Sequence, residues 1–85
     1  MSGYQSNGVK SGYEKALGAR LRAVRKRQGL SLRGVEAKSG GKWKGVVVGT
    51  YERAERSLTV ERLAGLAEFY GVPVTDLLPD AVAGR

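Results

Sequence analysis

The chain contains no cysteine and no histidine among its 85 residues. The first absence excludes a disulfide framework, and together the two absences exclude a zinc site of the usual kind. The apolar runs are a few residues long, far below the roughly 20 residues that a membrane-spanning helix needs. No charged segment followed by an apolar one opens the chain as a signal peptide would. We therefore expect one small, soluble, cytoplasmic domain.

Enzymatic function finds little support in the remaining residue types. Nucleophilic triads of the familiar kind need a histidine or cysteine, and the eight carboxylates show no clustered pairing along the sequence. Gly41-Lys42 is similar to the end of a phosphate-binding loop, but Trp43 follows where serine or threonine is needed. Glu36 also stands where that loop has its first glycine. We predict that the protein is not an enzyme, and that this chain binds no cofactor or metal.

Positive charge is abundant and unevenly placed. Residues 1–57 hold thirteen basic and four acidic side chains, a net charge of +9, whereas residues 58–85 hold two basic and four acidic ones. Such a concentration suits a polyanionic partner, either nucleic acid or an anionic membrane. The alternative is a basic protein whose lysines are simply solvated.

Helical spacing dominates the chain from Tyr13 onward. The apolar periodicity and the capping residues predict an all-α domain over residues 13–79, with five short helices at residues 13–28, 32–39, 45–53, 60–70 and 76–78. Ser11 with Glu14, Ser31, Thr59 and Thr75 are the expected N-caps. Gly29, Gly40-Gly41 and Gly71 are the expected stops.

Three stretches lack a clear helical pattern: the valines at 46–48 and the two ends of the chain. The valines at 46–48 favour a strand on propensity, but no second strand exists to pair with them, and we expect a helix there instead. Residues 1–12 are rich in glycine and serine without periodicity, and we expect a flexible N-terminal arm. Residues 80–85 are expected to form a frayed C-terminal tail.

Two runs of the sequence carry a family resemblance. They read LGARLRxxRxxxGLSL over residues 17–32 and YERAERSLTVERLAxLAxFYGVPVxxLL over residues 51–78. In this order they resemble the DNA-binding domain of the phage repressor/Cro family, also called the Xre family. The resemblance covers about three-quarters of the chain. It implies a compact five-helix, lambda-repressor-like domain with a helix-turn-helix, acting in a bacterial transcriptional regulator.

Two departures from the family pattern point to one of its branches. Glu36 stands where the usual motif has a small alanine, and the turn between the second and third helices is about two residues longer than usual. A longer turn would splay the two helices and let Glu36 reach solvent. The run GVEAKSGGKWKGVVVGTYER is similar to a branch of developmental repressors that shares both features. Members of that branch carry a C-terminal domain that binds cyclic di-GMP and drives dimerisation, so we expect this chain to be the DNA-binding part of a longer regulator.

The third helix, residues 45–53, is the expected recognition helix in the major groove. Short side chains on its leading face would let the backbone come close, with methyl contacts to thymine and a lysine near a guanine edge. The predicted base-reading residues are Lys44, Gly45, Val46, Val47, Gly49 and Thr50. Val48 and Tyr51 are expected in the core. The scarcity of asparagine, glutamine and arginine on this face indicates modest direct readout, helped by phosphate contacts and DNA shape.

Phosphate contacts form the second part of the expected interface. The predicted phosphate-binding residues are Ser31, Arg33, Lys42, Arg53 and Arg56, while Arg20 and Arg27 could equally be solvated surface. For Trp43 we favour a plug in the lengthened turn over stacking on the sugar-phosphate backbone. The family resemblance further implies a structural ion pair between Arg25 and Glu52.

The expected partner is double-stranded DNA, bound by two copies on a pseudo-palindromic operator at the nucleoid, with no membrane contact. RNA is less favoured because no exposed aromatic platform accompanies the basic residues. The alternative function is a helix-turn-helix protein-interaction or antitoxin module, and the +9 charge over residues 1–57 argues against it.

Overall fold

The structure, a computed structural model, describes residues 12–79. It contains four α-helices and one 3-10 helix in this range, and no strand. The helices are α1 (Gly12–Arg27), α2 (Leu32–Lys38), α3 (Gly45–Glu52) and α4 (Val60–Tyr70), followed by the 3-10 helix η2 (Val74–Leu77). The valines at 46–48 lie in α3, which confirms the helical prediction for them. The expected arm, its Ser11 cap and the tail lie outside the described residues, apart from Gly12.

Local capping explains most of the helix boundaries. Ser31 Oγ accepts a hydrogen bond from Gly34 N at 2.9 Å, and Thr59 Oγ1 accepts one from Arg62 N at 3.1 Å. Each hydroxyl satisfies a backbone donor that has no partner within its own helix. Gly29 and Gly71 have φ values of 73° and 72°, the left-handed conformation that glycine adopts at helix ends.

The prediction for the last element is wrong in kind and in position. It is a 3-10 helix that begins at Val74, and Thr75 lies within it instead of capping it. Pro73 occupies the preceding position with φ −65° and an extended ψ of 146°, and its ring fixes that φ. A four-residue segment that starts directly after proline is long enough for a 3-10 turn but not for a stable α-helix.

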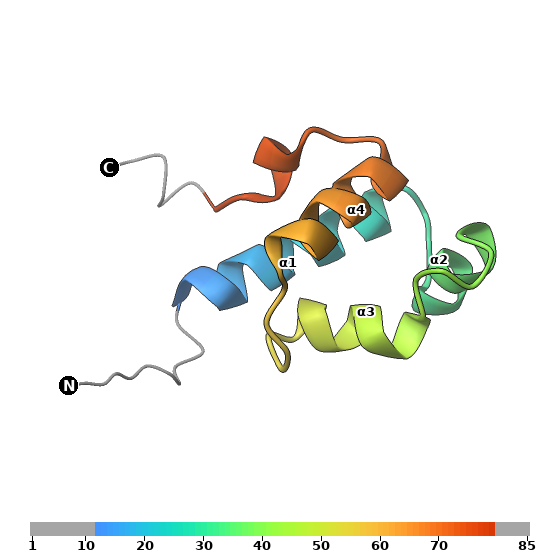
Figure 1. The fold of residues 1–85 in the computed structure, drawn as a ribbon, viewed down its shortest axis with the longest axis horizontal. Helices are drawn as coiled ribbons and strands as arrows, with labels where there is room; N and C mark the ends of the chain where they lie inside the picture. The colour runs from blue at the N-terminus through green and yellow to red at the C-terminus, as the bar shows by residue number, and fades with distance from the viewer. Residues whose placement is uncertain (1–11, 80–85) are drawn as a thin grey trace.

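The helices surround one core. In Figure 1, α1 lies between α3 on one side and η2 on the other, and both of these segments contact α1. α2 packs against α3, and α4 packs against η2. The buried apolar side chains come from all of these elements, and they are Leu21, Val24, Val35, Trp43, Val48, Tyr51, Leu66, Ala67, Tyr70 and Leu77. The burial of Val48 and Tyr51 agrees with the sequence prediction. None of the helices in residues 12–79 has the length and apolarity that crossing a bilayer requires.

Gly18 is the point at which α1 meets the end of α3. A Cβ atom added to Gly18 would lie 2.8 Å from the carbonyl oxygen of Tyr51 and even closer to that of Glu52. Only hydrogen therefore fits between the two backbones. From the sequence, this glycine is only a weak point within a helix, yet its missing side chain is what allows α3 to approach α1.

We predict that Gly18→Ala destabilises the fold, although alanine normally stabilises a helix interior by about 1 kcal/mol relative to glycine. The added methyl group must push the ends of α1 and α3 apart, and overpacking of this kind costs about 1–3 kcal/mol. Urea unfolding followed by circular dichroism measures the change. Gly12→Ala is the control, since a Cβ there meets nothing within 4 Å. Equal or higher stability of Gly18→Ala would contradict the proposed close approach.

Candidate nucleic-acid interface

The exposed face of α3 is formed by short side chains. Val46 is 79% exposed, while Val47 and Thr50 are half-buried beside it. The Thr50 hydroxyl donates to Val47 O at 2.6 Å, so its oxygen remains oriented as an acceptor on the helix surface. The face therefore offers methyl groups and one hydroxyl, with no long side chain to keep a partner at a distance.

Gly45 and Gly49, which were predicted among the base-reading residues, do not belong to this face. Both are buried, and both face α2. A Cβ at Gly45 would lie 2.7 Å from Leu32 O, and one at Gly49 would lie 3.2 Å from Leu32 Cδ1. Gly45 is needed because α2 and α3 pack in close contact there, whereas a Cβ at Gly49 would meet only the ends of the Arg53 and Leu32 side chains. Of the six predicted base-reading residues, the structure thus brings Val46, Val47 and Thr50 together on the outer face, with Lys44 exposed at its start.

The turn between α2 and α3 is held by internal contacts. Ser39 Oγ accepts from Trp43 N at 3.0 Å and donates to Glu36 O at 3.1 Å. The Trp43 ring is 8% exposed and lies directly on Gly65 of α4, where a Cβ would be 2.9 Å from the ring. Trp43 is therefore a plug, as favoured from the sequence. Lys42 and Lys44 on either side of it are exposed.

Glu36 has a role that the sequence analysis missed. Its Oε1 accepts a hydrogen bond from Gly45 N at 2.9 Å, and its Oε2 lies 3.9 Å from Lys44 Nζ. The side chain is 43% exposed, so it reaches solvent in part, as expected for the longer turn. The carboxylate also caps α3, because its Oε1 accepts from the first backbone N–H of that helix. No local signal in the sequence marks this cap, because Glu36 stands nine residues before Gly45 and follows no local capping pattern.

The predicted phosphate-binding residues are distributed over several elements. Arg33 follows the Ser31 cap of α2, and it lines a depression together with Leu32, Glu36, Gly45 and Val46. Arg33 and Lys42 are both exposed, Arg33 on α2 and Lys42 in the turn, where it lines a hollow with residues of α4. These side chains are free to carry positive charge toward a partner at the exposed face of α3.

Arg53 and Glu55 form an exposed ion pair just after α3. Arg53 Nε donates to Glu55 Oε2 at 3.0 Å, and Nη2 donates to Oε1 at 3.2 Å. This hydrogen bond raises the pKa of Arg53 and lowers that of Glu55. A phosphate that binds Arg53 must therefore compete with Glu55, a competition that sequence analysis did not foresee.

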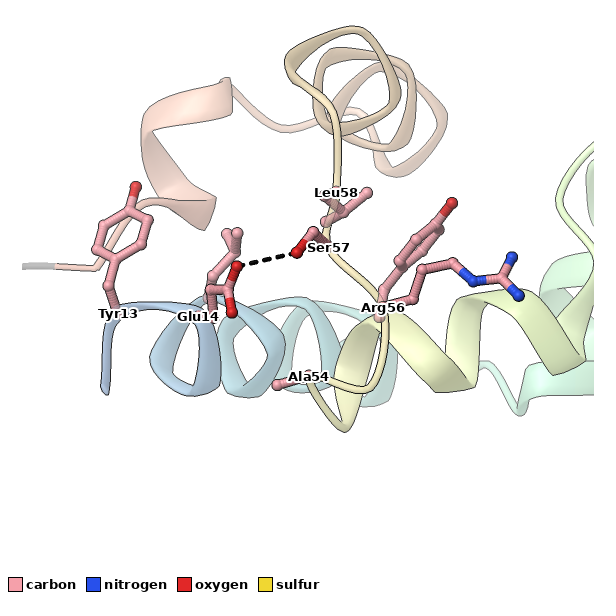
Figure 2. Close-up of a pocket in the computed structure, with 8 residues that line it drawn as sticks. Tyr13, Glu14, Ala54, Arg56, Ser57 and Leu58 are labelled. Atoms are coloured by element: carbon pink, nitrogen blue, oxygen red, sulfur yellow. Dashed lines mark hydrogen bonds between the residues drawn. The ribbon is translucent and has the colours of Figure 1, made fainter. Parts of the chain in front are cut away.

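Arg56 and Arg20 stand in other surroundings. Arg56 lines a pocket between the start of α1 and the loop after α3, together with Tyr13, Leu17 and Leu58. In Figure 2 the Glu14 carboxylate of the same pocket accepts from the Ser57 hydroxyl at 3.0 Å. The structure thus groups Arg56 with this pocket and not with the outer face of α3. Arg20 donates to Asp76 O at 3.4 Å, which directs it toward η2.

The ion pair of Arg25 and Glu52 is present at the junction of three segments. Arg25 Nε donates to Glu52 Oε2 at 2.7 Å, and Nη2 donates to Oε1 at 2.9 Å. Nη1 donates to Leu30 O at 2.8 Å. Both side chains are less than one-tenth exposed. The hydrogen bond that Arg25 donates to Glu52 raises the pKa of Arg25 despite its burial. One guanidinium therefore joins the end of α1, the segment before α2 and the end of α3.

Tyr70 lies in the core with an unpaired hydroxyl. Its oxygen is buried and has no hydrogen-bond partner within the part of the chain that the structure describes. Burial raises the pKa of Tyr70 to about 12, and the nearby Glu52 carboxylate acts in the same direction.

The chain is similar to known helix-turn-helix DNA-binding domains in sequence and in fold. Residues 16–79 match the family model described as a helix-turn-helix domain. A crystal structure of the DNA-binding domain of BldD is 69% identical, with a TM-score of 0.78, and the match covers 79% of this chain and 94% of that one. The BldD DNA-binding domain from S. venezulae is 68% identical, with a TM-score of 0.80, over 81% of this chain and all of that one. No curated protein sequence matches. The two structures confirm the resemblance drawn from GVEAKSGGKWKGVVVGTYER.

We predict that Tyr70→Phe changes the pH dependence of stability more than stability itself. At pH 7 the variant should be within about 1 kcal/mol of the wild type, because no hydrogen bond is lost. Tyrosine in the unfolded chain ionises near pH 10, whereas folded Tyr70 stays neutral to about pH 12. Between these values the unfolded state has fewer protons, so wild-type stability falls as the pH rises, by up to about 1.4 kcal/mol per pH unit.

Urea unfolding at pH 7, 10 and 11 gives the free energy of unfolding of both proteins. The difference between the two values at each pH measures the contribution of Tyr70 ionisation. The phenylalanine variant should lose less stability above pH 10 than the wild type. Parallel curves from pH 7 to 11 would contradict the raised pKa of Tyr70.

Proposed function

This chain belongs to the helix-turn-helix domain family, and from this we propose that it is the sequence-specific DNA-binding domain of a bacterial transcriptional regulator, with a BldD-like, lambda-repressor-like mode of docking. The observation that carries the proposal is the face of α3. This face consists of short side chains, with Val46 accessible to a partner. It occurs in a chain that is 68–69% identical to the DNA-binding domain of BldD over about four-fifths of its length. As a member of this family, the chain is a binding domain and not an enzyme.

Direct base readout rests on the outer face of α3. The major groove admits a helix whose side chains reach base edges, and a thymine presents its methyl group there. Val46 is 79% exposed and suits such a methyl contact, while Thr50 and Lys44 suit polar contacts to base edges. Buried Gly45 and Gly49 let α3 sit closely on α2 and so contribute through packing alone.

Phosphate contacts supply the larger share of affinity in this proposal. Arg33 lines a depression with Val46, Lys42 precedes α3 in the turn, and Arg53 follows its last residue. Arg56 lies apart from the face of α3, in the following loop, so its contact would be with a flanking phosphate. Each phosphate neutralised on duplex DNA lowers the logarithm of the affinity by about 0.9 per decade of salt. Arg53 contributes only after it exchanges Glu55 for a phosphate oxygen.

The assembly on DNA is also part of the proposal. A single α3 reads only a few base pairs, so we infer that two copies bind a pseudo-palindromic operator about one helical turn apart. The regulator then acts on chromosomal DNA, at the nucleoid in the cytoplasm.

The experiment is a selection of bound sequences from random duplex DNA, followed by gel-shift titration of the selected duplex and of a scrambled duplex. With four phosphate contacts, one copy should lose roughly 100-fold in affinity between 50 and 200 mM salt. The selected duplex should bind more tightly than the scrambled one at both concentrations. Weak binding that ignores sequence would overturn the proposal, and would favour a protein-interaction or antitoxin module.

We predict that Val46→Ala weakens binding to the selected duplex by about threefold to tenfold, because methyl contacts to thymine are lost. Folding should not change, since the Val46 side chain touches mainly solvent. Val60→Ala on α4 is a matched control, because Val60 is also an exposed valine in the first turn of its helix, at 84% exposed. The titrations above measure both variants. Equal effects of the two substitutions would show that α3 does not read the duplex through Val46.

A further inference from the structure

The start of α3 differs from the starts of the neighbouring helices in what caps it. α2 and α4 are capped locally by Ser31 and Thr59. The N-cap position of α3 is Lys44, whose side chain makes no capping hydrogen bond, and the first turn of α3 contains no acidic residue. The cap comes instead from α2, where Glu36 Oε1 accepts from Gly45 N at 2.9 Å.

This arrangement is possible because the turn holds the two helices at a fixed separation. Ser39 bonds to the backbone on both sides of the turn, and Trp43 is seated on Gly65 of α4. Gly45 itself lies against Leu32, with no space for a Cβ atom. The carboxylate of Glu36 therefore meets the first backbone donor of α3 in a defined geometry.

The position of Glu36 relative to the DNA-facing surface is equally defined. Glu36 lies one turn after Arg33 on α2, and the two residues line one depression with Val46. Its side chain is 43% exposed, and the second oxygen, Oε2, is 3.9 Å from Lys44 Nζ. A negative charge thus stands at the edge of the surface that presents Val46 to DNA.

A carboxylate in this place has an electrostatic consequence. The N-terminus of a helix attracts anions, and phosphate groups are commonly bound there. Glu36 already supplies the negative charge and also draws Lys44 toward itself. A DNA phosphate that approached the start of α3 would meet repulsion instead of a vacant donor. Non-specific complexes depend on phosphate contacts alone, so they lose most from such repulsion.

We propose that Glu36 is a specificity-determining positioning residue of this DNA-binding domain. It orients the start of α3 through its hydrogen bond with Gly45 N, and its charge repels a phosphate from that end of the helix. As a result, α3 docks in one register, with Val46 toward the bases. The inference rests on the proposed function. It assigns to Glu36 a contribution to discrimination between sequences, made by weakening the binding of non-specific duplexes.

Two variants separate the two parts of this role. Glu36→Gln keeps an oxygen for Gly45 N and removes the charge, while Glu36→Ala removes both. The control is Glu61→Gln, which changes the net charge equally at an exposed position on α4. Each protein is titrated with the selected and the scrambled duplex at 50 and 200 mM salt. The ratio of the two dissociation constants is the readout, and a general effect of net charge would change both constants alike and leave the ratio unchanged.

We expect the ratio to fall by about tenfold in Glu36→Ala, which corresponds to about 1.4 kcal/mol, and by a smaller factor in Glu36→Gln. Both variants should bind the scrambled duplex more tightly than the wild type does. In Glu61→Gln the ratio should stay unchanged. Without DNA, the Gly45 amide should exchange faster with solvent in Glu36→Ala than in Glu36→Gln.

Three results would overturn the inference. In the first, the ratio of dissociation constants changes no more in Glu36→Gln and Glu36→Ala than in Glu61→Gln. In the second, the Gly45 amide exchanges at the same rate in all of the proteins. A new selection with Glu36→Gln could also yield a different preferred base, which would make Glu36 a direct base reader. If the wild type itself does not prefer the selected duplex, the proposed function fails, and the inference fails with it.

Discussion

The structure depends on one buried guanidinium. Arg25 donates to both oxygens of Glu52 and to the carbonyl of Leu30, and it thereby joins the last turn of α1, the entry to α2 and the last turn of α3. Replacing a buried ion pair by apolar residues can leave stability unchanged, so net stabilisation is a poor reason for its presence. Its geometric effect is clearer, since a planar guanidinium with paired bonds permits one orientation of α3 relative to α1.

Glycines on two sides of α3 complete this constraint. Gly18 of α1 lets the carbonyls of Tyr51 and Glu52 approach, while Gly45 and Gly49 let α3 sit against Leu32 of α2. With Val48 and Tyr51 directed into the core, three sides of α3 are in contact with the domain. The remaining arc presents Val46, Val47 and Thr50. Recognition by such a helix depends on rigid placement, because the side chains themselves are too short to adapt.

Both basic and acidic side chains surround this arc, so a polyanion meets repulsion as well as attraction. Basic side chains at Arg33, Lys42 and Lys44 attract a polyanion, but Glu36 and Glu55 stand beside the start and the end of α3. A surface with cations alone would bind any duplex tightly. Carboxylates placed at both helix ends lower that general attraction and leave more of the binding free energy to base contacts.

The four α-helices could be predicted from the sequence nearly residue by residue, because their signals are local. Apolar spacing and the caps at Ser31, Thr59 and Gly71 place α2 and α4 within one residue of their observed ends. The face of α3 could not be predicted at Gly45 and Gly49. Glycine has no side chain whose polarity indicates inside or outside, and close packing is a property of two helices together. The cap from Glu36 and the pairing of Arg53 with Glu55 were missed because they depend on side-chain geometry around turns. The Arg25–Glu52 pair was reached only through family resemblance, since its partners are 27 residues apart.

We propose that Arg25 and Glu52 hold α3 so that its exposed arc enters DNA without rearrangement. The most direct measurement is an NMR titration of ¹⁵N-labelled protein with the selected duplex, following the backbone amides and the Arg25 Nε–H resonance. The account predicts the largest shifts at the start of α2 and over residues 42–50, with an Arg25 signal that stays sharp and unshifted. Shifts centred on α4 or on the pocket between α1 and the loop after α3, or loss of the Arg25 signal in the complex, would contradict it.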